Sequence, residues 1–207
     1  MLLWTIDETS GFDTTWAKVE GRRLQAAGRV VALSPRPHWL DYALETGVDF
    51  VHQRVSVTSR GQGRSASLDL RRDGDGRWSA NGERRPDLDD ALDCDLAACP
   101  LTNTMPVLRH DLHRAAGDRT FLMAFIEVPS LKVVTSRQRY THLRRTQDGG
   151  AVIRYASGSF RSDLTVDTNG FVVDYPHLGR RVRAGESAPE IRARPGSLRP
   201  DGGDVAP

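Results

Sequence analysis

Two cysteines and two histidines in the middle of the chain have a spacing that resembles a zinc site. Cys94, Cys99, His110 and His113 form the pattern C-x4-C-x10-H-x2-H, and thiolate and imidazole groups are the usual ligands of structural zinc. Segment 107–113 is predicted to be a strand, in which side chains three positions apart point to opposite faces. The two histidines would then not share a metal ion, so we expect no metal here.

Other motifs that could carry chemistry are incomplete. The run Asp73-Gly74-Asp75-Gly76 lacks the later oxygen ligands of a calcium loop, so a hairpin turn is the better interpretation. The Gly-x-Ser-x-Gly nucleophile motif is absent from the sequence, and Gly61-Gln62-Gly63 lacks the third glycine of a phosphate loop. The acidic residues between 87 and 95 are typical of a solvated edge, with a divalent cation site as the alternative. We therefore assign no catalytic residue and no cofactor.

Two predicted strands have an unusual polarity. Segment 121–126 is apolar on both faces. In segment 137–145, by contrast, each face carries polar side chains, so neither is a simple apolar core face. In the second, one face carries Gln138, Tyr140 and His142, and the other carries Arg139, Thr141 and Leu143. Together they indicate a curved sheet that encloses a partly apolar pocket suited to an amphiphile. The alternative is a barrel filled by its own side chains.

The elements that position these residues are predicted to be strands. Nineteen glycines and 11 prolines separate short runs of alternating or β-branched residues, which is typical of antiparallel strands joined by tight turns. We predict an all-β, mostly antiparallel fold, a curved sheet or incomplete β-barrel with few short helices, one of them within 86–92. A parallel sheet is disfavoured because its crossovers need more helices. The predicted strands are 15–19, 29–33, 40–46, 49–58, 65–71, 77–80, 106–113, 119–128, 137–145, 151–155, 160–166 and 171–175.

An internal duplication is one interpretation of the turns. Segments 70–78 and 164–172 share Leu, Asp, Asp or Asn, and Gly at identical spacing, and each is predicted to be a hairpin whose glycine has a positive φ. Upstream, segments 53–55 and 138–140 both begin Gln-Arg. Two similar β units would explain these matches, and chance recurrence of a common turn is the alternative.

The composition is that of one globular domain. Of 207 residues, 38% are hydrophobic and 27% charged, and 29 basic against 27 acidic residues leave a net charge of +2, which gives no support to nucleic-acid binding. We find no apolar run of transmembrane length and no basic region of a signal peptide, so we expect a cytoplasmic protein. Residues 1–183 are predicted to be one β domain and 184–207 a flexible tail rich in proline and glycine.

Segment 100–109, Pro-Leu-Thr-Asn-Thr-Met-Pro-Val-Leu-Arg, resembles the signature of the putative glycolipid-binding family, a group of bacterial proteins of about this length. The resemblance covers roughly residues 4–182, with departures at Asp90-Ala91, Leu101 and His110 that change charge and bulk. The other matching pieces, in chain order, are Gly76-Arg77-Trp78, Asp93-x-Asp95-Leu96, Gln138-x-Tyr140-Thr141 and the closing segment 166–176.

The resemblance implies a largely antiparallel β fold with a cavity for a lipid-like ligand, and it carries over no catalytic residues. Under this interpretation three polar side chains of the signature contact a sugar or phosphate head group, and three others line the cavity. The structural alternative is that the signature is a sharp corner bracketed by prolines. The head-group residues are Thr102, Asn103 and Arg109, and the cavity residues are Gln138, Tyr140 and Tyr155.

The leading prediction is therefore non-catalytic binding of a small amphiphilic ligand, a lipid or glycolipid. One alternative is a hydrolase or isomerase that uses the same cavity and a histidine such as His142. A second alternative is a structural or interaction module whose interior is filled.

Overall fold

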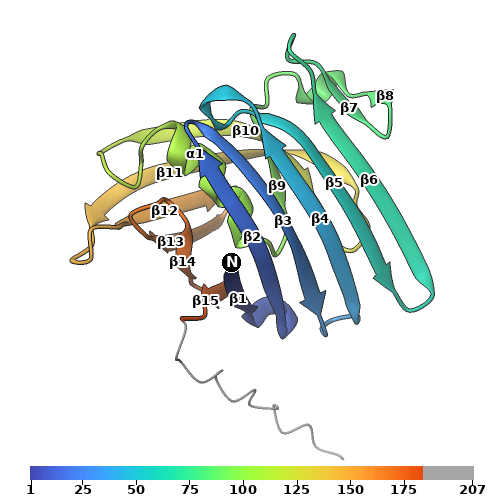
Figure 1. The fold of residues 1–207 in the computed structure, drawn as a ribbon, viewed down its shortest axis with the longest axis horizontal. Helices are drawn as coiled ribbons and strands as arrows, with labels where there is room; N and C mark the ends of the chain where they lie inside the picture. The colour runs from blue at the N-terminus through green and yellow to red at the C-terminus, as the bar shows by residue number, and fades with distance from the viewer. Residues whose placement is uncertain (184–207) are drawn as a thin grey trace, which may run out of the picture.

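A mostly antiparallel sheet of 15 strands contains most of the part of the chain that the computed structural model describes, residues 1–183 (Figure 1). The sheet is curved and does not close, which confirms the predicted incomplete barrel. From edge to edge, the strands are β8 (Glu83–Arg84), β7 (Trp78–Ala80), β6 (Arg64–Arg72), β5 (His52–Gly61), β4 (His38–Thr46), β3 (Arg23–Ala32), β2 (Gly11–Glu20), β1 (Leu2–Ile6), β15 (Gly179–Arg181), β14 (Val172–Tyr175), β13 (Phe160–Val166), β12 (Ala151–Ser157), β11 (Val133–Arg145), β10 (Asp118–Ile126) and β9 (Asp93–Leu96).

The predicted strands coincide with observed ones, apart from segment 106–113. Sequence patterns did not reveal β1, β8, β9 and β15, because these strands are short and, in β8, β9 and β15, rich in charge. All neighbouring strands are antiparallel except β9 and β10, which pair in parallel. The predicted tail, 184–207, lies outside the described residues.

The two connections on either side of the edge strand β9 fill the inner side of the curved sheet. The connection from β8 to β9 contains η3 (Pro86–Leu88), which confirms the short helix expected within 86–92, and the connection from β9 to β10 contains η4 (Pro100–Asn103) and α1 (Thr104–Arg109). In the part of the chain that the structure describes, the two further short helices are η1 (Asp7–Thr9) and η2 (Val48–Phe50). In Figure 1, α1 lies between the β2–β4 part of the sheet and β11. None of the helices within residues 1–183 combines the length and apolarity needed to cross a bilayer.

Two clusters of buried apolar side chains pack on different sides of the η4–α1 segment. The larger cluster joins β1 and β3–β7 to Met105 and Leu108 of α1 and also includes buried side chains of β9–β11, and the smaller joins β10–β14 to Val107. Every residue from 100 to 108 is buried, which is typical of a helix enclosed by a core on all sides. The η4–α1 segment therefore links the two halves of the sheet.

The strand predicted at 106–113 is wrong, since α1 and the turns that follow it occupy this segment. A short apolar run that is buried on all sides has no periodicity to distinguish helix from strand. Pro106 fits because it stands in the first turn of α1, where a missing N–H breaks no helical hydrogen bond.

This correction removes the strand argument that was used against a shared metal at His110 and His113. In the structure the His110 ring lies against Phe121, with the ring centroids 5.1 Å apart. Cys94 and Cys99 are buried free thiols. Within residues 1–183, no three side chains of the metal-ligating types gather at one point.

The two turns with matching sequence adopt the same hydrogen-bond pattern. In each, the carboxylate of the aspartate, Asp73 or Asp167, accepts hydrogen bonds of 2.8–3.1 Å from the backbone N–H groups two and four residues later. Gly76 and Gly170 have φ angles of 85° and 80°. The upstream matches differ in their setting, because β5 and β6 are neighbours whereas β12 lies between β11 and β13.

Candidate functional site

Five polar side chains form one hydrogen-bonded network inside the second half of the sheet. The Asp95 carboxylate accepts hydrogen bonds from Nε2 of Gln138 at 2.6 Å and from the Thr102 hydroxyl at 2.9 Å. The Tyr140 hydroxyl donates to Oε1 of Gln138 at 3.3 Å and accepts from Nδ2 of Asn103 at 2.8 Å. All five residues are buried, so these polar groups satisfy one another away from water.

Backbone geometry explains why these residues meet. Gln138 and Tyr140 stand two positions apart on β11, so both point to the inner face. Thr102 and Asn103 are consecutive in η4, which packs against β9 and β14. Asp95 enters from β9, the edge strand beside β10. The network therefore joins the sheet to the segment that fills it.

Burial controls the charge of this network. It raises the pKa of Asp95, while the hydrogen bonds from Gln138 and Thr102 oppose the rise. The pKa of Tyr140 is raised well above its ordinary value, first by burial and then by the nearby Asp95. The Tyr140 phenol therefore keeps its proton at neutral pH, and it serves as a hydrogen-bond donor rather than a base.

A row of aromatic rings leads from the network to the surface. Tyr155 of β12 meets Tyr140 edge to face at a centroid distance of 5.3 Å, and it lies 6.0 Å from both Tyr175 and Phe160. Tyr155 and Tyr175 are each 6% exposed, whereas Phe160, at the start of β13, is 44% exposed. The row therefore reaches solvent at the turn between β12 and β13.

Hydroxyl groups accompany the outer part of this row. Ser136 and Ser157 lie with their Oγ atoms 3.2 Å apart, and Ser157 also hydrogen-bonds Tyr155. Within residues 1–183 the Tyr175 hydroxyl has no hydrogen-bond partner. Burial raises the pKa of both phenols, so both remain protonated donors. We refer to Ser136, Tyr155, Ser157, Phe160 and Tyr175 as the tyrosine end of the sheet.

The structure brings five of the six residues predicted for ligand binding into contact. Four belong to the network, and the fifth packs on the ring of Tyr140. Sequence patterns did not single out Tyr175 or Phe160, whose strands carry no polar alternation of the kind seen in segment 137–145. The five residues are Thr102, Asn103, Gln138, Tyr140 and Tyr155.

Arg109, the sixth predicted residue, is engaged elsewhere. Its guanidinium forms a bidentate ion pair with the Asp93 carboxylate and donates to the carbonyl oxygens of Asp49 and Phe50 at 3.0 and 2.9 Å. The two charged side chains are 7% and 0% exposed. Burial raises the pKa of Asp93, and Arg109 opposes the rise. The ion pair fixes the end of α1 to β9, and the hydrogen bonds to the carbonyl oxygens fix it to η2.

The acidic residues between 87 and 95 were predicted to form a solvated edge. This prediction is wrong for Asp93 and Asp95, which are both buried. The reason is tertiary, since β9 packs against η4 and β5 in addition to pairing with β10. A third buried carboxylate, Asp13 of β2, accepts hydrogen bonds of 3.1 Å from the hydroxyls of Thr15 and Tyr42. Burial raises the pKa of Asp13 to about 6.

Three of the six histidines in the described part of the chain, His38, His52 and His142, contact backbone carbonyl oxygens. Nδ1 of His142, the histidine of the enzyme alternative, lies 2.7 Å from the Leu112 carbonyl oxygen. His52 stacks on Trp78 at a centroid distance of 4.6 Å. Within residues 1–183 no histidine ring forms an ion pair with a carboxylate.

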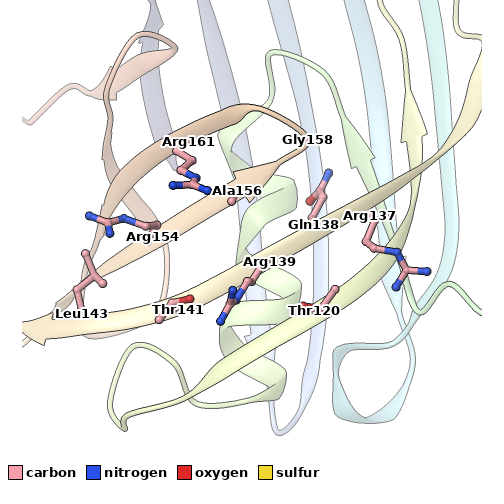
Figure 2. A pocket seen from close by; sticks show the side chains of 10 residues that line it. All are labelled: Thr120, Arg137, Gln138, Arg139, Thr141, Leu143, Arg154, Ala156, Gly158 and Arg161. Carbon is pink, nitrogen blue, oxygen red and sulfur yellow. The ribbon is translucent and has the colours of Figure 1, made fainter.

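The outer face of β11–β13 carries an open groove of about 520 Å³ (Figure 2). Its floor includes Thr141 and Ala156, and Leu143 lies at one end. In Figure 2, Gln138 points away from Arg139, in keeping with the alternation of side chains along β11. Four arginines, Arg137, Arg139, Arg154 and Arg161, surround the groove.

Comparisons with known proteins place the chain in a family. Residues 1–181 match the family described as "Putative glycolipid-binding". A DUF1089 family protein from Pseudomonas aeruginosa, known from a crystal structure, is 30% identical, with a TM-score of 0.69 over 82% of this chain and 92% of that one. A β-barrel-like protein of a domain of unknown function, from Brucella abortus, is 9% identical, with a TM-score of 0.44 over 87% and 92%. A search of curated proteins finds no match. The chain therefore belongs to the putative glycolipid-binding family.

Proposed function

We propose that the protein binds a small amphiphile, a lipid or glycolipid, without covalent chemistry at the tyrosine end of the sheet. The observation that carries this proposal is the aromatic row that runs from the buried Tyr140 through Tyr155 to the half-exposed Phe160. Tyrosine offers an apolar ring to an acyl chain or a sugar face and a hydroxyl to a polar group. The family description supports the same class of ligand.

In this proposal Tyr155 and Tyr175 contact the ligand. The Tyr175 hydroxyl, which has no partner within residues 1–183, is the donor available to a ligand hydroxyl or ester oxygen. Thr102, Asn103, Gln138 and Tyr140 form the rigid base behind Tyr155, because their polar groups already hydrogen-bond one another. Arg109 has a structural role, since Asp93 and two carbonyl oxygens use its donors.

The filled interior restricts where such a ligand sits. Residues 100–108 are buried and occupy the inner side of the sheet, so the proposal places the ligand at the tyrosine end and not along the full length of the sheet. The same buried segment favours the second candidate, a structural or interaction module with a filled core. Ligand binding distinguishes the two.

The first experiment is native mass spectrometry of the protein purified gently from a bacterial host, followed by organic extraction and lipid analysis. We expect a stoichiometric additional mass that extracts as a lipid or glycolipid. The second experiment is calorimetric titration with dodecyl maltoside below its critical micelle concentration, which provides an acyl chain with a sugar head, and with maltose alone.

Three variants locate the binding. Tyr155→Leu removes the ring and hydroxyl but keeps apolar bulk, and Tyr175→Phe removes only the unpartnered hydroxyl. We expect both to weaken dodecyl maltoside binding, Tyr155→Leu more strongly. The control is Trp16→Ser, which removes an indole that is 69% exposed on β2. If Tyr155→Leu binds as tightly as the parent, the site is wrong. An apo mass together with no detergent binding would favour the filled module.

A further inference from the structure

We propose that the groove on the outer face of β11–β13 is an anion site that takes a phosphate group. The groove opens on the face of β11 that carries Arg139 and Thr141. Gln138 borders it, but the Gln138 side chain points away from Arg139 to the other face of the strand, so the groove is separate from the site proposed above (Figure 2). Its volume, about 520 Å³, exceeds what a phosphate group alone needs. It therefore accommodates a phosphate that belongs to a larger molecule.

The strand register creates a hollow between two arginines. Ala156 of β12 lies directly opposite Arg139 of β11 on one side and Arg161 of β13 on the other. Side chains of directly opposed residues stand about 5 Å apart on one face. Because alanine is short, the space above it is open, and two long side chains that end in guanidinium groups flank it. In Figure 2 the Arg161 guanidinium lies beside Ala156.

The charges around the groove do not cancel. Arg139 is paired with Asp118, and Arg154 forms a bidentate pair with Asp163 over 2.8 and 3.0 Å. Within residues 1–183, Arg161 has neither an ion pair nor a hydrogen bond to its side chain. The same holds for Arg137, again among the described residues. Four arginines thus line the groove, and two carboxylates are paired with them.

Guanidinium groups suit a phosphate for a specific geometric reason. The planar fork of arginine donates two parallel hydrogen bonds to two phosphate oxygens, and a second arginine across the hollow completes the contact. The hydroxyls of Thr120 and Thr141 line the same groove and add neutral donors. Leu143, at one end, is 39% exposed and offers an apolar contact to the remainder of the ligand.

Calorimetric titration with inorganic phosphate at low ionic strength tests the site directly. We expect saturable binding with one phosphate per chain. The double variant Arg137→Gln and Arg161→Gln removes the two arginines without ion pairs and should weaken the affinity at least about tenfold, since hydrogen bonds to charged groups are strong. Both side chains are exposed, so folding should be unaffected, which circular dichroism checks.

Two further variants distinguish a specific phosphate site from nonspecific electrostatic attraction of phosphate to the protein. Ala156→Leu fills the hollow without changing any charge, and we expect it to abolish phosphate binding. The double variant Arg60→Gln and Arg64→Gln removes the same charge from the exposed β5–β6 hairpin, and it should leave the affinity within about twofold, because salt screens distant charges. If the groove variants bind phosphate as the parent does, or if the hairpin variant loses as much, the proposal is overturned.

Vesicles distinguish a lipid head group from a soluble phosphate compound. The probes are phosphatidylcholine vesicles with and without phosphatidylglycerol, in a flotation assay with the same variants. Binding of inorganic phosphate alone assigns the site to soluble phosphate compounds. Binding to the phosphatidylglycerol vesicles that is lost in Ala156→Leu assigns it to a lipid head group. If neither probe binds, the groove is not an anion site.

Discussion

The side-chain amide of Asn103 donates a hydrogen bond of 2.8 Å to the hydroxyl of Tyr140. This bond joins η4, which fills the inside of the sheet, to the longest strand of the sheet, β11. Both residues are buried, at 4% and 0% exposure. The hydroxyl also donates to Gln138, so its position depends on two elements at once.

The Tyr140→Phe variant tests the cost of breaking this contact. The amide of Asn103 would lose its acceptor in a place that water does not reach, so we expect the free energy of unfolding to fall by about 1–3 kcal/mol. Urea denaturation measures the change. The matched control is Tyr155→Phe, whose hydroxyl lies nearer the surface and whose removal should cost less. Equal losses in the two variants would contradict the role of the network.

The buried ion pair between Arg109 and Asp93 leads to a second prediction. Arg109→Met leaves the Asp93 carboxylate buried without a partner, and we expect a loss of about 3–5 kcal/mol in the free energy of unfolding. The double variant with Asp93→Leu should recover much of that loss, because no isolated charge remains. As a control, Arg29→Met breaks the exposed pair with Asp41 and should cost less than about 1 kcal/mol. Chemical denaturation of all four proteins tests this order.

The two matching turns provide a third, paired prediction. Gly76 and Gly170 have nearly the same positive φ, so Ala at either position costs about 1–2 kcal/mol in backbone strain. A Cβ at Gly170 would also lie 2.6 Å from Cδ2 of the buried Leu108, whereas at Gly76 its nearest neighbour is the flexible Arg72 side chain. We expect Gly170→Ala to lose about 1–3 kcal/mol more stability than Gly76→Ala. Similar melting temperatures for the two variants would disprove the close approach of α1 to this turn.

Asp13 leads to a prediction about pH. Its pKa in the folded protein, about 6, is above the ordinary value of 3.8, so folding favours the protonated carboxyl. The stability that this group contributes is complete below pH 3.8 and is lost as pH rises toward 6. The shift corresponds to about 3 kcal/mol.

The Asp13→Asn variant removes this titration. The difference in the free energy of unfolding, variant minus parent, should therefore increase by about 2 kcal/mol between pH 4 and pH 7. Urea denaturation of both proteins at intervals across this range measures it. A difference that stays constant with pH would show that Asp13 does not titrate within this range in the folded protein.

Local sequence patterns were enough to predict most strands of the sheet. Alternating side chains and turns with Asp-Gly or Asn-Gly predict the strands and hairpins, because these signals act between residues that are near one another in the chain. The turns at Asp73 and Asp167 show this best, since each carboxylate bonds the backbone within four residues. The alternation along β11 likewise assigned Gln138 and Tyr140 to one face and Arg139 to the other.

Only the tertiary structure shows which segments pack on the inner side of the curved sheet. Segment 106–113 was predicted as a strand, but α1 continues to Arg109 and turns follow it. An apolar run enclosed on all sides carries no period that would distinguish a helix from a strand. Asp93 and Asp95 look like surface residues in the sequence, and only the position of β9 makes them buried partners of Arg109 and Gln138. The meeting of Asn103 with Tyr140, 37 residues apart, depends on contacts between distant segments, which local propensity does not encode.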